Sequence, residues 1–294
     1  MTRLNFHGED VVPAAPGQAL FHIIPVPLEQ TVSYGAGTVN GPHAILEASA
    51  QLELFDGVSI PADYGIHTAP PLPCDHSIEQ TLLAIEQAVA GASLQKSVPV
   101  LLGGEHSLSL GAIKGLKQHY GDFGVVQFDA HADLRDSYSG TKNSHACVMR
   151  RIVEEDIPIY QFGTRSYSLE EQQFREEKGI WYRDAETIWR DYDKASTLPP
   201  DCPEKIFITF DVDCFDASVM PATGTPVPGG LNWYQVVWAI QKMLQDKICL
   251  GFDLVELAPQ DSMHGASFSV AQLAYNMMGY LTRSAINRTF YNLS

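Results

Sequence analysis

The 294-residue sequence lacks any apolar run long enough to span a bilayer, and its first ten residues lack the apolar core of a signal peptide. It also lacks internal repeats and low-complexity linkers. The most linker-like segment, 198–203, is short and leads straight into an apolar run. We therefore expect a cytoplasmic protein in which residues 1–294 form a single domain.

Cysteine is scarce and scattered. The five cysteines include no C-x-x-C pair and are odd in number, which argues against a disulfide framework or a zinc cluster. Cys147 and Cys214 lie beside candidate site residues, so a functional thiol is one interpretation. The favoured prediction for both is a small buried hydrophobic residue.

Basic residues are also few. The chain has 19 lysines and arginines against 35 aspartates and glutamates, which gives a net charge of −16. Such a charge opposes binding to nucleic acid and to anionic membranes, so we expect neither as a partner. It would attract a small cationic substrate, although acidity is also a common source of solubility.

Short apolar runs alternate with amphipathic helical patterns along the whole chain. This alternation predicts an α/β fold, a three-layer α/β/α sandwich with a central, mainly parallel sheet. The expected strands are 20–26, 98–102, 124–128, 157–162, 206–210 and 248–254. The expected helices are 42–53, 78–92, 107–119, 145–155, 168–178, 185–192, 232–245 and 268–285.

Ionisable side chains follow four of these strands, at the edge of a parallel sheet where ligands bind. If the strand continues as extended backbone, side chains at every second residue leave on one face and converge. Carboxylates and imidazoles packed together need a cation, because like charges in one pocket would otherwise protonate. The residues concerned are His106, Asp129, His131, Asp133, Asp211, Asp213 and Glu256.

Several of these residues have structural alternatives when taken alone. His106 follows a Gly-Gly turn and could belong to a strand–helix connection, while Asp211 and Asp213 could cap the next turn. His145 could be a surface histidine at a helix start. Glu256 is either a salt-bridged structural residue or a receptor for a cationic group. Four strand ends that all carry such residues favour a metal site.

The ligand set of four aspartates and two histidines exceeds the need of one ion. Hard oxygen donors with few imidazoles suit Mn²⁺ better than Zn²⁺. Two ions bridged by aspartates lie about 3.5–4 Å apart and share a water, which loses a proton near neutral pH and becomes a nucleophile. The residues therefore predict a two-metal hydrolase and leave its substrate open.

Several motifs, in order, resemble those of the ureohydrolase family, which includes arginase and agmatinase. The resemblance runs from about Tyr34 to the last helix and implies homotrimers or homohexamers. The matching motifs are GGEHS (103–107), DAHAD (129–133), Ser144-His145, FDVDCFD (210–216), PATGTP (221–226) and Glu256.

The resemblance also implies roles for individual residues. Two Mn²⁺ ions would be bridged by Asp129 and Asp211. Glu256 would receive the guanidinium group beside Thr225, and His145 would shuttle a proton to the leaving amine. We count Asp133 with these two catalytic residues. The implied ligands are His106, Asp129, Asp133 and Asp211 for one ion, and His131, Asp129, Asp211 and Asp213 for the other.

Agmatine, cleaved to putrescine and urea by a metal-bridging hydroxide, is the expected substrate. The 134–143 loop, which we expect to select the substrate, is one residue shorter than in arginases. Ser168 stands where arginases carry an aspartate that contacts the amino-acid end of arginine. The 144–151 run is most like prokaryotic agmatinases. Arg135 is either a substrate contact or a structural ion-pairing residue.

Other functions stay open. Guanidinobutyrate and arginine are alternative substrates, because Ala217 and Ala222 depart from the agmatinase pattern. A deacetylase with one zinc ion would share the broad fold. A non-catalytic, metal-stabilised assembly protein is the alternative from another class, and intact His145 and Glu256 count against it.

Overall fold

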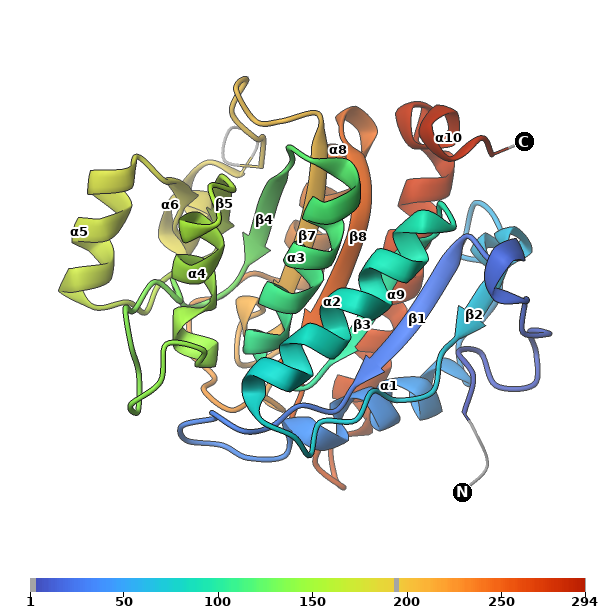
Figure 1. The fold of residues 1–294 in the computed structure, drawn as a ribbon, viewed down its shortest axis with the longest axis horizontal. Helices are drawn as coiled ribbons and strands as arrows, with labels where there is room; N and C mark the ends of the chain where they lie inside the picture. The colour runs from blue at the N-terminus through green and yellow to red at the C-terminus, as the bar shows by residue number, and fades with distance from the viewer. Residues whose placement is uncertain (1–3, 193–195, 294) are drawn as a thin grey trace.

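The computed structural model describes residues 4–192 and 196–293. Within these residues, eight strands form one sheet in the order β2-β1-β3-β8-β7-β4-β5-β6 (Figure 1). Every strand pairing is parallel, which confirms the expected α/β class. The strands are β1 (Phe21–Val26), β2 (Ile66–Thr68), β3 (Val98–Gly103), β4 (Gly124–Phe128), β5 (Ile159–Phe162), β6 (Trp181–Arg183), β7 (Lys205–Asp211) and β8 (Ile248–Val255).

Helices cover both faces of the sheet and complete the three-layer sandwich (Figure 1). One face carries α2 (Ile78–Leu94), α3 (Ser109–Tyr120), α4 (Val148–Glu154) and α5 (Leu169–Lys178). The other carries α1 (Gly41–Ser49), α6 (Ala185–Arg190), α8 (Trp233–Asp246) and α9 (His264–Arg283), and α10 (Ala285–Tyr291) packs on α9. None of the described helices combines the length and apolar content needed to cross a bilayer.

Strand side chains alternate between two hydrophobic clusters, one on each face of the sheet. In β7, Ile206, Ile208 and Phe210 join the cluster that includes α8 and α9, whereas Phe207 joins the cluster of α2 and α3. Burial on both faces explains why the strands read as continuous apolar runs in the sequence. The sheet is therefore a rigid platform for whatever lies at the ends of its strands.

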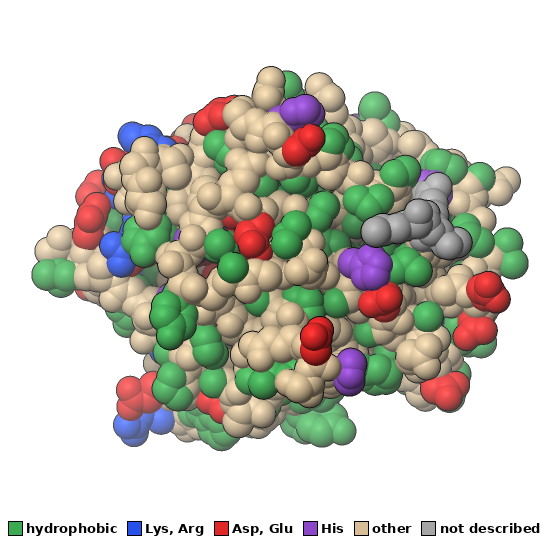
Figure 2. Space-filling view, turned by 90° about the horizontal axis from the view of Figure 1, so that it is seen from below, with side chains coloured by type: hydrophobic (Ala, Val, Ile, Leu, Met, Phe, Trp, Pro, Cys, Tyr) green, Lys and Arg blue, Asp and Glu red, His purple; other side chains and the backbone are tan. Residues whose placement is uncertain are grey.

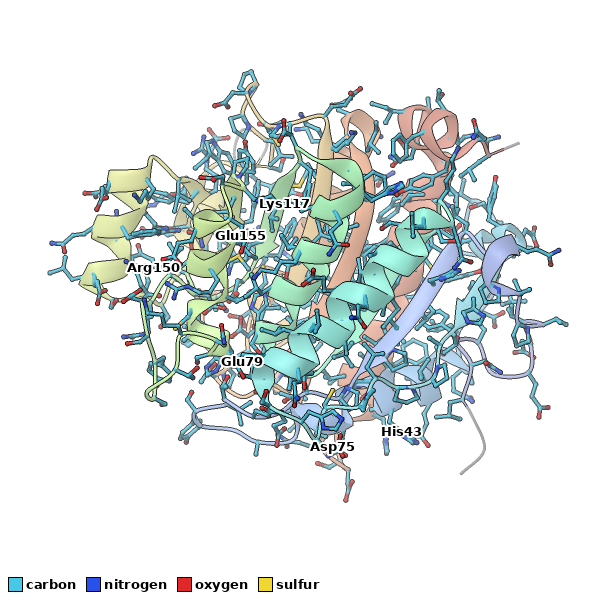
Figure 3. The ribbon with its side chains drawn as sticks, in the orientation of Figure 1. His43, Asp75, Glu79, Lys117, Arg150 and Glu155 are labelled. Atoms are coloured by element: carbon cyan, nitrogen blue, oxygen red, sulfur yellow. The ribbon has the colours of Figure 1, made fainter. Side chains whose placement is uncertain are left out.

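Polar contacts tie the outer helices to each other and to the loop after the DAHAD segment (Figure 3). A carboxylate oxygen of Glu155, just after α4, lies 3.1 Å from Lys114 Nζ, and its other oxygen lies 3.6 Å from Lys117 Nζ of α3. Glu79 of α2 accepts a hydrogen bond from Asn143 Nδ2 at 3.1 Å. Such exposed contacts add little stability, but the last one anchors the loop to the helix layer.

The structure contains two strands and one helix that the sequence analysis does not predict. The edge strands β2 and β6 have three residues each, too few to show a hydrophobic period. α10 follows α9 after the single residue Ser284, so the pattern of the two helices merges in the sequence. The helix expected at 42–53 ends earlier, at Ser49.

Candidate metal centre and active site

The predicted metal ligands and Glu256 follow the four central strands. β3, β8, β7 and β4 are neighbours in the sheet, so their carboxyl ends lie side by side. Figure 2 looks onto this side of the molecule, where lysine and arginine side chains are few and lie toward one end. Beneath the site, the Phe210 ring stacks on Phe128 at 5.5 Å and packs against Phe215 at 5.3 Å. A packed aromatic layer thus fixes the strand ends.

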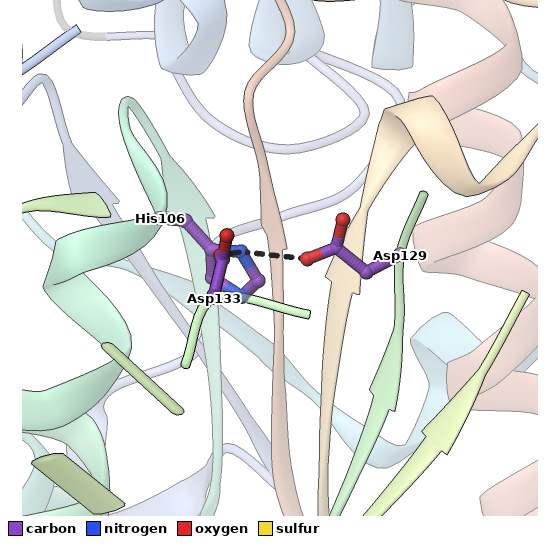
Figure 4. A group of neighbouring side chains, drawn as sticks. All are labelled: His106, Asp129 and Asp133. Atoms are coloured by element: carbon purple, nitrogen blue, oxygen red, sulfur yellow. Dashed lines mark ion pairs between the residues drawn. The ribbon is translucent and has the colours of Figure 1, made fainter. Parts of the chain in front are cut away.

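His106, Asp129 and Asp133 form a first group of candidate ligands (Figure 4), and Asp211 lies beside them. His106 Nδ1 lies 3.0 Å from Asp133 Oδ2, 3.2 Å from Asp129 Oδ2 and 3.6 Å from Asp211 Oδ2. All four side chains are buried. Three carboxylates around one imidazole nitrogen form the kind of donor set that holds a divalent cation.

A second group lies beside the first and shares Asp129 with it. His131 Nδ1 is 3.0 Å from Asp213 Oδ2 and 3.7 Å from Asp129 Oδ1. Asp129 therefore turns one oxygen toward each group, as a bridging carboxylate would. The two buried clusters are consistent with a binuclear metal site.

The backbone route to this convergence differs from the sequence prediction, which assumed extended backbone through Asp133. The strand β4 ends at Phe128, and Asp133 has a left-handed φ of 53°. A turn brings the side chains together, and the N–H of His131 donates to Asp129 Oδ1 at 2.6 Å. The i, i+2 spacing therefore reflects a carboxylate-capped turn more than strand alternation.

The same carboxylate-capped turn follows β7. The N–H of Asp213 donates to Asp211 Oδ1 at 2.8 Å, and Asp213 Oδ1 accepts the N–H of Ala130 at 3.0 Å. Asp211 ends the strand, whereas Asp213 lies in a 3-10 turn. The two ligand segments are thus bonded to each other, which holds their remaining carboxylate oxygens in place.

His106 offers a direct test of whether the residues fit a cation. Its Nε2 lies 2.8 Å from Thr209 Oγ1, and the Thr209 hydroxyl donates to Asp253 Oδ1 at 2.7 Å. Thr209 must then accept from Nε2–H, so the neutral ring presents a lone pair at Nδ1. That nitrogen is buried and has no hydrogen-bond partner within the described chain. A lone pair facing carboxylate oxygens fits a bound metal ion.

Without a cation, the clusters hold protons in its place. Burial and the charge of Asp129 raise the pKa of Asp133 to about 7. Burial alone would lower the pKa of His131, but its bonds to Asp129 and Asp213 raise it to about 11. Burial and the charges of Asp213 and Asp129 likewise raise the pKa of Asp211 well above its usual value. A divalent cation would displace these protons.

We therefore expect Mn²⁺ uptake to release protons and its affinity to rise with pH. Between pH 6 and pH 8 the cation-free clusters bind more protons than the metal-loaded ones, so raising the pH favours loading. Calorimetric titration of metal-free protein in two buffers of different ionisation enthalpy measures the protons released. An affinity that is constant from pH 6 to pH 8 would contradict the expectation.

A buried hydrogen-bond chain supports Asp129 from behind. Gln127 Nε2 donates to Asp129 Oδ2 at 2.7 Å, and Gln161 Nε2 donates to Gln127 Oε1 at 2.5 Å. Arg175 Nε donates in turn to Gln161 Oε1 at 2.8 Å, and its side chain is fully buried. Each amide is oriented by the next, so the chain aims one N–H at the shared carboxylate.

Gln127→Leu tests this support. The change keeps the approximate size of the side chain, removes the bond to Asp129 and leaves the Gln161 amide with the Ala132 carbonyl as its remaining acceptor. We expect metal affinity to fall by about 10- to 100-fold, the usual cost of losing a partner behind a metal ligand. Competition with a fluorescent chelator measures the affinity. Gln172→Leu, at a half-buried helix position that contacts Arg175 and no ligand, is the control.

One cavity of about 320 Å³ joins the clusters to the predicted substrate residues. It reaches His106, His131, Asp133 and Asp211 at its inner end. The predicted catalytic and substrate residues that line it are His145, Glu256, Thr225, Arg135 and Ser168. The structure thus brings every predicted substrate residue to the same space as candidate metal ligands.

Glu256 and His145 come from the segments that follow two different strands, β8 and β4. Glu256 follows β8 with a left-handed φ of 64°, and its Oε1 accepts the N–H of His106 at 2.7 Å. Burial raises the pKa of Glu256 to about 8. His145 begins a 3-10 turn capped by Ser144, and burial lowers the pKa of its imidazole. A neutral imidazole and a buried carboxyl group thus share the cavity.

Arg135 and Ser168 are both engaged with Glu171. Arg135 Nε lies 4.0 Å from Glu171 Oε2, and its guanidinium lies over the Tyr138 ring at 5.3 Å. Ser168 caps α5, and its hydroxyl donates to Glu171 Oε2 at 2.8 Å. This geometry favours the structural interpretation of Arg135 that the sequence left open.

The two cysteines beside the site are buried and free. Burial raises the pKa of the Cys147 thiol to about 11 and that of Cys214 further. Both stay protonated at neutral pH, and a thiol is a poor nucleophile and ligand in that state. The prediction of small hydrophobic residues therefore fits their surroundings.

Sequence reasoning missed the residues that orient the site. Thr209, Asp253 and Gln127 lie inside strands, where a lone polar residue gives no local sign of its partner. The cavity wall also includes residues 32–35. The family resemblance starts near Tyr34, but the sequence alone predicts no contact of this segment with substrate. A polar residue in the middle of an otherwise apolar strand is the one available signal.

Comparisons with known proteins agree with this geometry. A model of the arginase family matches residues 19–279. The N(1)-aminopropylagmatine ureohydrolase of Synechocystis sp. is 37% identical over 272 residues, which cover 88% of each chain. The agmatinase of Pyrococcus horikoshii is 35% identical over 267 residues, which cover 89% of this chain and 92% of that protein.

A solved structure shows the same fold. The agmatine ureohydrolase of Thermoplasma volcanium has a TM-score of 0.86 and 27% identity, and the alignment covers 95% of this chain and 94% of that one. The family model also spans all of the strands that form the sheet and every predicted ligand. The chain therefore belongs to the arginase family and is a ureohydrolase.

Proposed function

We propose that this ureohydrolase cleaves the terminal guanidinium group of an agmatine-type polyamine and releases urea. The observation that carries this proposal is the placement of Glu256. Its carboxylate lines the same cavity as the clusters and is bonded to the backbone of His106, a candidate ligand. A planar cation held by Glu256 would therefore have its central carbon close to the metal centre.

We propose two Mn²⁺ ions as the resident metals. The donor set is rich in carboxylates, and the free Nδ1 of His106 faces three of them, which suits this hard cation. When bound, the ions would supply Lewis-acid activation of a water molecule. The proposed ligands are those of the two implied sets: His106, Asp129, Asp133 and Asp211, and His131, Asp129, Asp211 and Asp213.

The protein residues would then act in three ways. Glu256 would accept guanidinium N–H groups and orient the cation, with Thr225 beside it in the cavity wall. Asp133 would accept a hydrogen bond from the attacking water. His145 would give a proton to the leaving amine nitrogen, which completes the release of urea.

The sequence motifs alone suggested agmatine as the substrate. We now favour N1-aminopropylagmatine. Curated ureohydrolases of Synechocystis and Thermococcus kodakarensis, at 37% and 35% identity, carry the name of the longer compound. Agmatine is the second candidate, because the Pyrococcus horikoshii protein at 35% identity is an agmatinase. The contact of Arg135 with Glu171 leaves less positive charge for a substrate carboxylate, which disfavours guanidinobutyrate and arginine.

Urea release from purified, manganese-loaded protein tests the proposal. We expect the highest kcat/KM with N1-aminopropylagmatine, a lower value with agmatine, and far lower values with arginine, guanidinobutyrate and guanidinopropionate. A preference for any of the last three substrates would overturn the polyamine assignment. Absence of urea from all five, by a protein with two bound Mn²⁺, would overturn the proposed reaction.

A further inference from the structure

Glu105 is a buried carboxylate that lies beside a candidate ligand but belongs to neither cluster. It is fully buried and accepts four hydrogen bonds. Its Oε2 accepts the N–H groups of Gln30 and Thr31, each at 2.6 Å. Its Oε1 accepts the hydroxyls of Thr31 at 2.7 Å and Ser107 at 2.6 Å. A carboxylate so well satisfied is held in one position.

The Thr31 hydroxyl joins this carboxylate to His145. Thr31 Oγ1 lies 3.2 Å from His145 Nδ1 and accepts the N–H of His145 at 3.0 Å. Because the one hydroxyl proton is donated to Glu105, Thr31 can only accept from the ring. The contact with Nδ1 is therefore a hydrogen bond when that nitrogen carries a proton.

We propose that Thr31 is a positioning residue, which with Glu105 fixes His145 in the Nδ1–H tautomer and leaves Nε2 to exchange the catalytic proton. Ser144 Oγ also lies 3.3 Å from Nδ1 and accepts the N–H of Ala146. Its own hydroxyl proton can rotate away from the ring, so this contact is also compatible with a proton on Nδ1. No hydrogen bond to Nε2 is formed within the described part of the chain, and the His145 ring lines the cavity.

The arrangement mirrors the one at His106. There a carboxylate, Asp253, takes the proton of Thr209, which then accepts from Nε2–H and frees Nδ1 for the cluster. At His145 the roles of the two ring nitrogens are reversed: Thr31, whose proton goes to Glu105, contacts Nδ1, and Nε2 is left free. The same arrangement thus leaves Nδ1 of His106 bare toward the cluster and leaves Nε2 of His145 free to take up and release the catalytic proton.

This inference rests on the proposed function of His145 as the proton donor. The imidazolium would give its Nε2 proton to the leaving nitrogen, and the neutral ring would keep its Nδ1 proton on Thr31. The opposite tautomer would place an N–H where a base must take up the next proton. The loop that carries Thr31 also contributes 32–35 to the cavity wall, so the substrate and the donor share one support.

Thr31→Val tests the inference with an isosteric change. Glu105 would keep its other three bonds, so folding and metal binding should persist. We expect kcat to fall on the order of 10- to 100-fold with KM within about twofold, because proton transfer is impaired and substrate binding is not. Thr31→Ser should restore kcat to within about threefold of wild type. Two bound Mn²⁺ per chain should remain in both variants.

Thr38→Val is the matched control. Its hydroxyl donates at 3.0 Å to the carboxylate of Glu29, which lies two residues before Thr31, and it does not contact His145. We expect no comparable loss of kcat. An equal loss in Thr38→Val, unchanged kcat in Thr31→Val, or a loss explained by missing metal would overturn the proposal.

The double variant separates positioning from packing. In a His145→Ala background, Thr31→Val should have no further effect on turnover, and an undiminished effect there would overturn the proposal. Long-range ¹H–¹⁵N correlation of Mg²⁺-loaded protein reads the tautomer without turnover. We expect Nδ1–H at His145 in wild type and its loss in Thr31→Val. This readout stands even if no urea is released, in which case the proposed reaction fails and the tautomer assignment does not.

Discussion

Asp129→Asn should abolish turnover and empty both metal positions. Asp129 turns Oδ2 toward His106 and Oδ1 toward His131, so the two candidate clusters depend on the same carboxylate. The amide keeps the size of the side chain but removes the charge and replaces one oxygen with an N–H₂ group. Each cluster would then lose an anionic ligand through one substitution.

We expect less than one Mn²⁺ per chain and a fall in kcat of more than about 10³-fold, or roughly 4 kcal/mol. Elemental analysis and urea release measure the two effects, and circular dichroism checks the fold. Asp216→Asn is the control, because Asp216 follows the neighbouring strand β7. Within the described residues its carboxylate accepts hydrogen bonds from Ser218 and from the N–H groups of 229 and 230, and from no candidate ligand. Full metal content and turnover in Asp129→Asn would exclude it as the bridging ligand.

Glu256→Gln should impair catalysis with the metals in place. Glutamine keeps the oxygen that accepts the N–H of His106, so the local backbone, including its left-handed φ of 64°, should persist. What disappears is the negative charge that would pair with the guanidinium. Removing one partner of a buried ion pair costs about 2–5 kcal/mol, or roughly 30- to 5,000-fold in kcat/KM.

The measurements for Glu256→Gln are steady-state kinetics with both polyamine substrates and metal analysis. A loss confined to kcat/KM, at two Mn²⁺ per chain, supports a guanidinium receptor. If kcat/KM stays within a few-fold of wild type, the substrate cation is held elsewhere. Loss of metal would instead assign Glu256 a structural role behind His106.

Much of the fold could be predicted because strands that are buried on both faces have long apolar runs in the sequence. Such runs located six of the eight strands. β2 and β6 escaped because three residues at a sheet edge need no continuous apolar pattern. Their pairing depends on neighbours such as β1 and β5, which local patterns do not contain.

The ligand types of the site were also readable, but its geometry was not. Spacing suggested extended backbone through Asp133, whereas a turn and a left-handed residue produce the convergence. Orientation was still less accessible, because it depends on partners far along the chain. Thr31 and His145 are 114 residues apart, and Gln127 and Gln161 are 34 apart. No local pattern predicts that these side chains meet.

The position of β8 has a consequence for how the protein is made. Residues 248–255 pair with β3 on one side and β7 on the other, so the last strand to be synthesised joins the two halves of the sheet. A growing chain already carries the ligands of β3, β4 and β7, yet it has no continuous sheet to hold them together. The candidate ligands therefore come together late in folding, when β8 inserts between β3 and β7 and also brings Glu256 to the site.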